Sequence, residues 1–285
     1  EKPEFHVIPT DTINIHIDKD ALLRSGIMLP KTIRHLKEED LKDAIPDKLY
    51  ISLTDIRMLT KVDLLMLEML ANCNWERPLY LAISVGSVSK LKFDNYFVQE
   101  GLAFRFTPFD YKKWGDVGEN RLYAVDVERL YDNVMNRYKY GGLDTPGLYL
   151  DETTLRTCWY HRRLFAQLAK ELIAQGDNEC AKKVLAYAEQ VIPGYNVPET
   201  HESGSYDIAT AYAALGEKTK AVTLAVHLIA EAEDYINWAF SLKGNRIEMV
   251  RNDCIYKFWQ WNQYNELLKK IDGEKYKESN RRFEE

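Results

Sequence analysis

The chain has 285 residues, of which 46% are hydrophobic and 29% charged, and its formal net charge is −6. This balance is that of an ordinary globular protein, and the length suffices for about two domains. An acidic chain lacks the basic face that DNA or RNA binding requires, so nucleic acid is not an expected partner. No stretch approaches about 18 consecutive apolar residues, so we expect no segment to cross a membrane.

The first half of the chain mixes strand and helix patterns. Strand-like composition or alternation occurs at residues 13–17, 48–53, 78–85, 102–107 and 121–127. Asp20 is well placed to cap a short helix that begins at Ala21. Thr60 and Asp63 have the spacing of a capping box, which predicts a helix that runs to about Ala71. Apolar residues occupy two faces of that helix, so we expect it to be largely buried.

Residues 165–193 have the pattern of a tetratricopeptide-like helix–turn–helix repeat. The residues that carry the pattern are Phe165, Leu168, Ala169, Leu172, Gly176, Ala181, Leu185, Ala188 and Pro193. A weaker copy lies 40 positions further on, at Ile208, Ala209, Tyr212, Gly216, Ala221, Ala225 and Leu228. Residues 235–242 and 246–271 predict a third, degenerate helix pair broken at Gly244. The tail from Glu274 has few large apolar residues, so we expect it to be frayed.

The segment from Tyr138 to Asp151 is rich in glycine and proline, which is typical of turns. We therefore place a domain boundary near Leu148. The expected fold is an α+β domain of residues 1–148 with a small mixed sheet, followed by an all-α, tetratricopeptide-like helical-repeat domain of residues 149–285. The chain begins at Glu1 rather than at methionine, and we expect it to be part of a longer protein.

Five segments together carry a resemblance to a known family. They are IPTDT (8–12), LTKVDLLMLEMLANCNWERPLYLA (59–82), EGLAFRFTP (100–108), YDNVMNRYKYGG (131–142) and GLYLDETTLR (147–156). On these segments the chain resembles the soluble C-terminal region of a Bacteroidetes family of polytopic membrane proteins. That family is similar to protein O-mannosyltransferases, which are C-type glycosyltransferases.

The resemblance implies a division of labour within a larger protein. In such enzymes the catalytic acids lie in loops between membrane helices, outside the region that this chain resembles. The chain would then be a non-catalytic accessory or interaction domain on the periplasmic face of the inner membrane. Its implied partners are the membrane-embedded catalytic domain of the same chain and a protein or peptide acceptor, and no cofactor is implied.

The residues themselves favour no catalytic centre. Asp18 and Asp20 form a DxD motif, which in other glycosyltransferases holds a divalent cation and a diphosphate, but helix capping by Asp20 is the simpler interpretation. The six histidines and four cysteines show no zinc-ligand or hydrolase spacing, and the cysteines are expected to be buried free thiols. We therefore expect no metal site and no enzymatic activity of this chain alone.

A candidate binding surface follows from the repeat pattern. The first helices of stacked repeats line a common groove. The residues that point there from the two repeats are Trp159, Arg163, Lys170, Tyr206 and Thr210. Two cations beside two aromatic rings would suit an acidic or extended peptide, although the same residues would also form an ordinary solvated helix face.

The alternative function is a carbohydrate-binding module that uses exposed aromatic residues of the first domain. Trp75 and Arg77 would stack on and hydrogen-bond a sugar or a peptide. The competing interpretation is that Trp75 packs the corner between a helix and a strand while Arg77 pairs with Glu76. Trp259 and Trp261 lie two residues apart and cannot share a helix face, so at least one is exposed or contacts another element.

Overall fold

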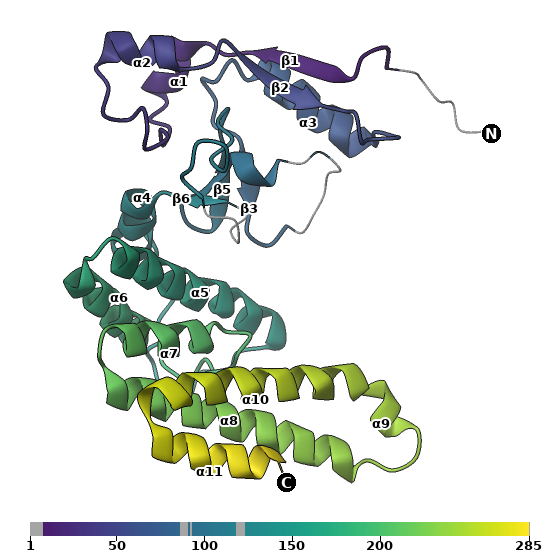
Figure 1. Ribbon diagram of the computed structural model, residues 1–285, viewed down its shortest axis with the longest axis vertical. Coiled ribbons are helices and arrows are strands. Elements are labelled where there is room, and N and C mark those ends of the chain that lie inside the picture. Colours follow the sequence, from purple (N-terminus) through teal and green to yellow (C-terminus); the bar gives the residue numbers. More distant parts are fainter. Residues whose placement is uncertain (1–7, 86–90, 92, 118–122, 285) are drawn as a thin grey trace. The chain divides into compact units, whose positions relative to one another are not determined.

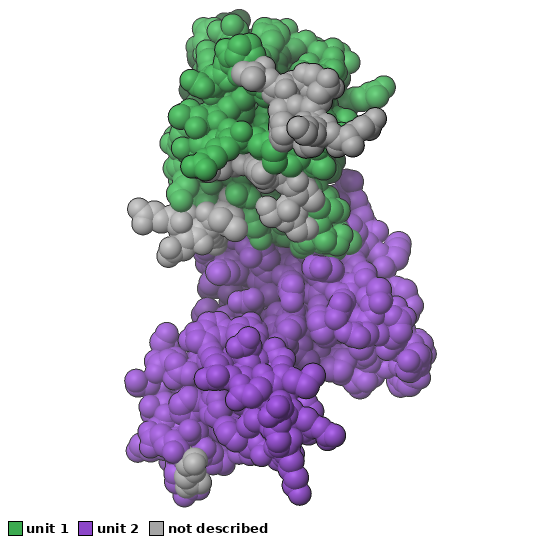
Figure 2. All heavy atoms as spheres, turned by 90° about the vertical axis from the view of Figure 1, so that its right-hand side faces the viewer, with its two compact units in different colours: residues 1–130 green, residues 131–285 purple. Residues whose placement is uncertain are grey.

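The computed structural model describes residues 8–85, 91, 93–117 and 123–284. The chain forms two compact units, residues 1–130 (unit 1) and 131–285 (unit 2), which are coloured separately in Figure 2. Unit 1 contains two small sheets with short helices, and the described part of unit 2 is helical (Figure 1). The expected α+β domain followed by an all-α domain is therefore confirmed. Among the described residues, no helix combines the length and apolarity needed to cross a bilayer.

The strands of unit 1 form two sheets, whereas the sequence predicted one. Their bounds are β1 Thr12–His16, β2 Lys48–Ser52, β3 Tyr80–Ala82, β4 Phe97–Gln99, β5 Ala103–Phe106 and β6 Ala124–Val125. Strands β1 and β2 pair in antiparallel fashion, and the second sheet has the order β3-β5-β4-β6. This second sheet is mixed, as expected, because β4 pairs with β6 in parallel and with β5 in antiparallel orientation. The sequence missed β4, and residues 121 and 122 of the fifth predicted strand lie outside the described residues.

The helices of unit 1 are short. They are α1 Lys19–Arg24, α2 Glu38–Ala44, α3 Lys61–Asn72 and α4 Val127–Asp132, which reaches into unit 2, with a 3-10 turn at Asp94–Tyr96. The capping box of Thr60 and Asp63 is present at the start of α3. The cap of α1 is Asp18, whose side chain accepts from the backbone N–H of Ala21, and not Asp20 as predicted. Asp20 instead forms an ion pair with Lys42 at 2.6 Å.

Helix α3 is not largely buried, so this prediction was wrong. Leu67 and Leu70 face the core, but Val62, Leu64, Leu65 and Met69 are each about half exposed, with Leu65 reaching 61%. The helix thus carries apolar residues on two faces and covers only one of them. An exposed aliphatic surface of this kind commonly marks a site of association with another apolar surface.

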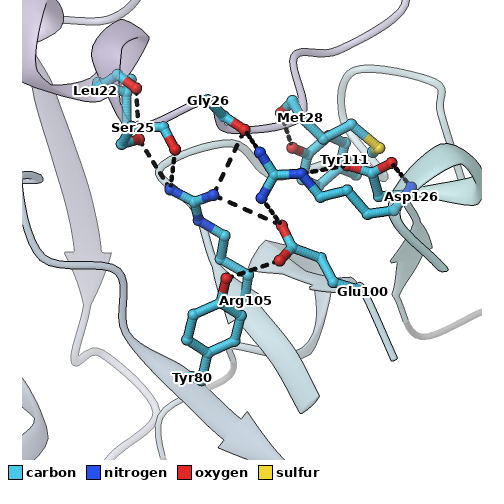
Figure 3. A network of polar contacts seen from close by, with 10 residues as sticks. Leu22, Ser25, Gly26, Met28, Tyr80, Glu100, Arg105, Tyr111 and Asp126 are labelled. Atoms are coloured by element: carbon cyan, nitrogen blue, oxygen red, sulfur yellow. Dashed lines mark hydrogen bonds and ion pairs between the residues drawn. The ribbon is translucent and has the colours of Figure 1, made fainter. Parts of the chain in front are cut away.

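A buried polar network joins the second sheet to the loop after α1 (Figure 3). Arg105 on β5 is 3% exposed and donates to the carbonyl and hydroxyl oxygens of Ser25 at 3.0 and 2.9 Å. The carboxylate of Glu100 accepts from Arg129 at 3.0 Å and from the hydroxyl of Tyr80 at 2.7 Å, and it lies 3.7 Å from Arg105. Two guanidinium groups therefore compensate one buried carboxylate, as burial of a charge requires.

Unit 2 is built from successive helix pairs (Figure 1). After a π-helical turn at Asn133–Arg137, its helices are α5 Glu152–Ala174, α6 Asn178–Val191, α7 Ser205–Ala214, α8 Lys218–Ser241, α9 Arg246–Met249, α10 Arg251–Ile271 and α11 Gly273–Glu284. Helix α5 packs on α6, and α7 packs on α8. The apolar residues of both repeat patterns are buried, and Gly176 and Gly216 adopt the left-handed backbone that ends α5 and α7. The two predicted helix pairs are thus confirmed.

The third pair differs from the prediction. Residues Tyr235 to Ser241 are the last turns of α8 rather than a separate helix, and α10 packs on α8 and also on α11. The predicted frayed tail is helix α11, because the indole nitrogen of Trp261 donates to the hydroxyl of Ser279 at 2.8 Å and that hydroxyl donates to Asn265 at 2.6 Å. The ring of Phe283 also packs edge-on against Phe258 and Trp261, at 5.9 and 5.4 Å between centroids, so polar and aromatic contacts together hold the last helix.

The units divide between Leu130 and Tyr131, earlier than the predicted boundary between residues 148 and 149. The glycine-rich segment belongs with the helices because its side chains pack there. The ring of Tyr140 lies 5.5 Å from that of His161 and 5.6 Å from that of Phe165, measured between centroids. Asn196 donates to the carbonyl oxygen of Leu143 at 2.7 Å. Turn composition therefore indicated a loop correctly but did not show which unit the loop joins.

Replacement of Ala181 by leucine tests the core of the first pair. Ala181 is fully buried at the start of α6, where a larger side chain has no room. We expect Ala181→Leu to lower the free energy of unfolding by roughly 1–3 kcal/mol. Ala186→Leu, at an exposed position of the same helix, is the matched control and should change stability little. Equal urea midpoints for the two variants would contradict close packing at Ala181.

Candidate functional site

The loop between α6 and α7 is held against α5 by one buried side chain, Arg162. Its two terminal nitrogens donate to the carbonyl oxygens of Ile192 (3.0 Å), Val197 (2.5 Å) and Pro198 (2.7 Å) and to the hydroxyl of Ser203 (3.1 Å). Backbone carbonyls without helix or sheet partners are therefore satisfied by a single guanidinium. The loop owes its shape to this set of bonds.

Arg162 is 3% exposed and forms no ion pair with a described residue. Burial lowers its pKa to about 10, and the more distant carboxylate of Glu199 opposes this shift. A guanidinium remains charged at neutral pH even so, and neutral oxygens alone solvate it. Loss of its hydrogen bonds would leave both the N–H groups of the guanidinium and the oxygens of the loop buried without partners.

The next residue of α5, Arg163, lies on the exposed side and contacts the end of the same loop. Its Nε donates to the carbonyl oxygen of Glu202 at 2.6 Å, and a terminal nitrogen bonds the same oxygen. The guanidinium also lies 5.8 Å from the ring centroid of Tyr160. Arg162 thus bonds both ends of the loop, and Arg163 adds a contact at its C-terminal end.

The fixed loop places His201 among four aromatic rings, and we call these five residues the aromatic cluster. Its members are His201, Tyr206 on α7, and Tyr256, Trp259 and Tyr264 on α10. The imidazole stacks on Tyr206 at 5.7 Å between centroids and meets Tyr256 and Trp259 edge-on at 6.0 and 5.9 Å. Its Nδ1 lies 2.9 Å from the hydroxyl of buried Tyr264. Three segments of the chain therefore meet at one imidazole.

The buried cation beside the aromatic cluster is engaged by two carboxylates of the protein. Lys257 is largely buried and lies 3.6 Å from the carboxylate of Glu202 and 3.4 Å from that of Glu231. Burial raises the pKa of Glu231 more than Lys257 lowers it. Burial also acts to raise the pKa of Glu202, but its own backbone N–H, Lys257 and Gln260 together hold that pKa below its usual value. The cations here are thus already engaged by protein groups.

The structure brings together only part of the predicted binding surface. Arg163 and Tyr206 both border the loop that carries His201. Lys170 lies two helical turns beyond Arg163, is exposed and forms no ion pair with a described residue. Thr210 donates to the carbonyl of Asp207 within its own helix at 2.8 Å. Trp159 is half-buried, and its indole nitrogen is buried without a hydrogen-bond partner among the described residues.

Trp75 is a core residue, so the interpretation of its ring as a ligand-stacking surface is corrected. It is 6% exposed, its indole nitrogen donates to the carbonyl of His16 at 2.9 Å, and its ring stacks on Phe106. Asn74 and Trp75 both have positive φ, so the chain turns sharply here between α3 and β3. Arg77 is exposed, and no ion pair with Glu76 is formed.

Sequence analysis missed His201, Tyr256 and Trp259 as site residues. The one signal was the spacing of Trp259 and Trp261, since Trp259 is 50% exposed while Trp261 is buried. His201 gave no signal, because its role depends on contacts with residues that follow it by more than 50 positions.

No group of three or more histidine, cysteine, aspartate or glutamate side chains with metal-binding geometry occurs in the described part of the chain. All four cysteines are free, and the predicted burial holds for Cys158 and Cys254 but not for Cys73 and Cys180, which are partly exposed. The predicted DxD carboxylates serve as a helix cap and an ion-pair partner.

A cavity of about 410 Å³ lies between α6, α7 and α8. Part of its polar rim is paired, since Glu189 accepts from Lys220 at 2.7 Å and from Tyr212 at 2.6 Å. The described geometry there offers a largely apolar pocket with a polar rim but no nucleophile activated by a neighbouring base.

Comparison with known proteins gives one match. Residues 1–128 match the family model described as TMEM260-associated domain 2, which corresponds closely to unit 1. The name of this family links unit 1 to a glycosyltransferase-like protein, TMEM260. Neither the curated proteins nor the solved structures give a match.

The role of Arg162 is testable by comparison with its neighbour. Arg162→Met should lower the free energy of unfolding by about 3 kcal/mol or more, because several buried carbonyls lose their donors. Arg163→Met removes bonds to one exposed carbonyl and should cost about 1 kcal/mol or less. Amide hydrogen exchange over residues 193–204 should quicken in the first variant more than in the second. Equal protection of this segment in both variants would show that Arg162 does not hold the loop.

Two half-buried histidines predict a loss of stability at mildly acidic pH. Burial lowers the pKa of His161 and of His201, and around His201 the carboxylates of Glu202 and Asp207 oppose this while Lys257 and Arg163 add to it. A histidine in the unfolded chain has a pKa of about 6.5. As the pH falls below that value, the unfolded chain therefore binds protons at these two histidines before the folded chain does. Stability present above pH ~6.5 is therefore lost progressively until the folded-state pKa is passed.

The measurement is urea unfolding at pH 7.5 and 5.5, with the parent compared to a His161→Gln/His201→Gln double variant. The variant should lose less stability on acidification. Glu231 titrates in the opposite sense, because burial raises its pKa, and comparison of the two proteins removes its contribution. His227→Gln, at an exposed position of α8, is the control. An unchanged pH dependence in the double variant would contradict the assignment.

Proposed function

We propose that this chain is a non-catalytic accessory part of a membrane-embedded, protein O-mannosyltransferase-like glycosyltransferase, where it engages the acceptor protein on the periplasmic side. The observation that carries the proposal is the match of unit 1 to TMEM260-associated domain 2, which agrees in direction with the resemblance of the sequence motifs. Unit 2 adds a stack of helix pairs, an architecture whose extended surfaces suit protein or peptide partners.

The exposed face of α3 supports association with a second apolar surface. Leu64, Leu65 and Met69 together with Val62 present aliphatic groups without a hydrogen-bonding function. Contact with another apolar surface stabilises such a face, because the contact removes its aliphatic groups from water. In the proposed arrangement it would contact the membrane-embedded catalytic domain.

The carbohydrate-binding alternative loses its main residue in unit 1 with the burial of Trp75. Tyr50 and Tyr80 are exposed there, but they belong to different sheets. The hydroxyl of Tyr80 is also held by Glu100. We therefore favour acceptor protein over free carbohydrate as the partner.

The test separates chemistry from acceptor engagement. The isolated chain, incubated with polyprenyl-phosphate mannose and an acceptor peptide, should transfer no sugar. Removal of the chain from the complete glycosyltransferase should lower glycosylation of acceptor proteins at least about tenfold but leave hydrolysis of the lipid-linked donor unchanged. Transfer by the isolated chain that disappears in Asp18→Asn would overturn the proposal, as would equal loss of acceptor glycosylation and donor hydrolysis.

A further inference from the structure

We propose that the aromatic cluster of unit 2 binds a proline-rich peptide segment in the extended polyproline II conformation. This inference rests on the proposed function for the role of the bound segment, and it deepens that function by naming the class of peptide. Four observations carry it: the fixed rings, their exposure, the engaged cations and the free donors of the cluster.

The rings are held in place before any ligand arrives. Tyr256 and Trp259, one helical turn apart on α10, stack on each other at 5.5 Å with planes 11° apart. His201 contacts both rings and is itself bonded to buried Tyr264. Because these side chains are already ordered, binding of a ligand to them costs little side-chain conformational entropy.

The outer part of the cluster is open to solvent. Tyr256 and Trp259 are 47% and 50% exposed, while Tyr264 beneath them is buried. Exposed aromatic faces on a rigid support are typical of grooves that receive proline rings, which pack flat against them. A flexible side chain such as that of lysine would not provide a rigid, flat surface of this kind.

The charges of the cluster favour an uncharged ligand. Lys257 is shared by Glu202 and Glu231, and Arg163 is bonded to the carbonyl of Glu202. An acidic peptide would have to displace these contacts before it gained a cation. A proline-rich segment requires no charge partner, so surroundings in which the cations are already engaged suit it better than the acidic peptide expected from sequence.

The hydrogen-bonding groups of the cluster match such a segment. The indole N–H of Trp259 and the hydroxyl of Tyr256 form no hydrogen bond with a described residue. Proline has no backbone N–H, and a polyproline II helix has no internal hydrogen bonds, so its carbonyl oxygens are free to accept. Two donors on the protein thus face a ligand that offers acceptors alone.

A sugar fits the same rings less well. Sugar hydroxyls need both donors and acceptors, and the carboxylate of Glu202 beside the rings is already engaged, since it binds Lys257 and accepts from Gln260 at 3.2 Å. Peptide addition to a sheet edge is excluded in this region, since α7, α10 and the loop between α6 and α7 contain no strand. Proline-rich peptide is therefore the ligand that the geometry favours.

The experiment is a titration of the complete chain with fluorescein-labelled decaproline, followed by fluorescence anisotropy. We expect saturable binding by the parent and at least a tenfold weaker affinity for Trp259→Ala and for Tyr256→Ala. Trp238→Ala is the matched control, because Trp238 is an equally exposed tryptophan on α8 outside the cluster. Circular dichroism melts of all variants establish that each remains folded.

Three outcomes would overturn the inference: no saturation by decaproline at millimolar concentration, equal affinity of Trp259→Ala and Trp238→Ala, or competition by mannotriose at lower concentration than by unlabelled decaproline. The last outcome would make the cluster a sugar site. The binding test is independent of the transfer assay of the proposed function. A failure of one therefore does not produce a failure of the other.

Discussion

The buried guanidinium of Arg162 is the contact on which the arrangement of unit 2 depends. A loop of a dozen residues between two helices has backbone carbonyls that no helix or strand can satisfy, and Arg162 satisfies three of them from one position on α5. Because the loop is fixed, His201 lies against α7 and α10 instead of in solvent. This side chain thereby adds to the direct packing of α5 on α7 and of α8 on α10, and the exposed rings of α10 acquire a rigid support.

The helix pairs could be predicted from sequence because their determinants are local. Small residues such as Ala181 and Ala221 and large ones such as Leu185 and Leu228 recur at helical spacing, and the same periodicity that forms each helix also decides which face is buried. The site could not be predicted in the same way. Its contacts join His201 to residues 55 to 63 positions later, and no periodic pattern encodes which loop residue meets which ring.

In unit 1 an element was predicted correctly but its packing was not. The pattern of α3 correctly predicted a capped apolar helix, but apolarity on two faces indicates a preference for burial and not the partner that provides it. Within the described residues, Leu67 and Leu70 pack on the core while Leu65 does not. Similarly, strand β4 was missed because its three residues are defined by pairing with β5 and β6 rather than by their own alternation. The boundary between the units was also not evident from sequence. The ring of Tyr140 packs against Phe165 of α5, although the residues around Tyr140 have the composition of a turn.

The two units therefore present surfaces of different chemistry, and this difference argues for two kinds of partner. The face of α3 is aliphatic and offers no hydrogen bond, so it discriminates little among apolar surfaces and is suited to permanent association. The aromatic cluster combines ring faces with an indole N–H and a phenol hydroxyl, and the cation beside it is already engaged by two carboxylates. Such a surface binds weakly through few contacts but selects by shape and by acceptor position, which is what a domain needs if it must hold one acceptor segment and then release it.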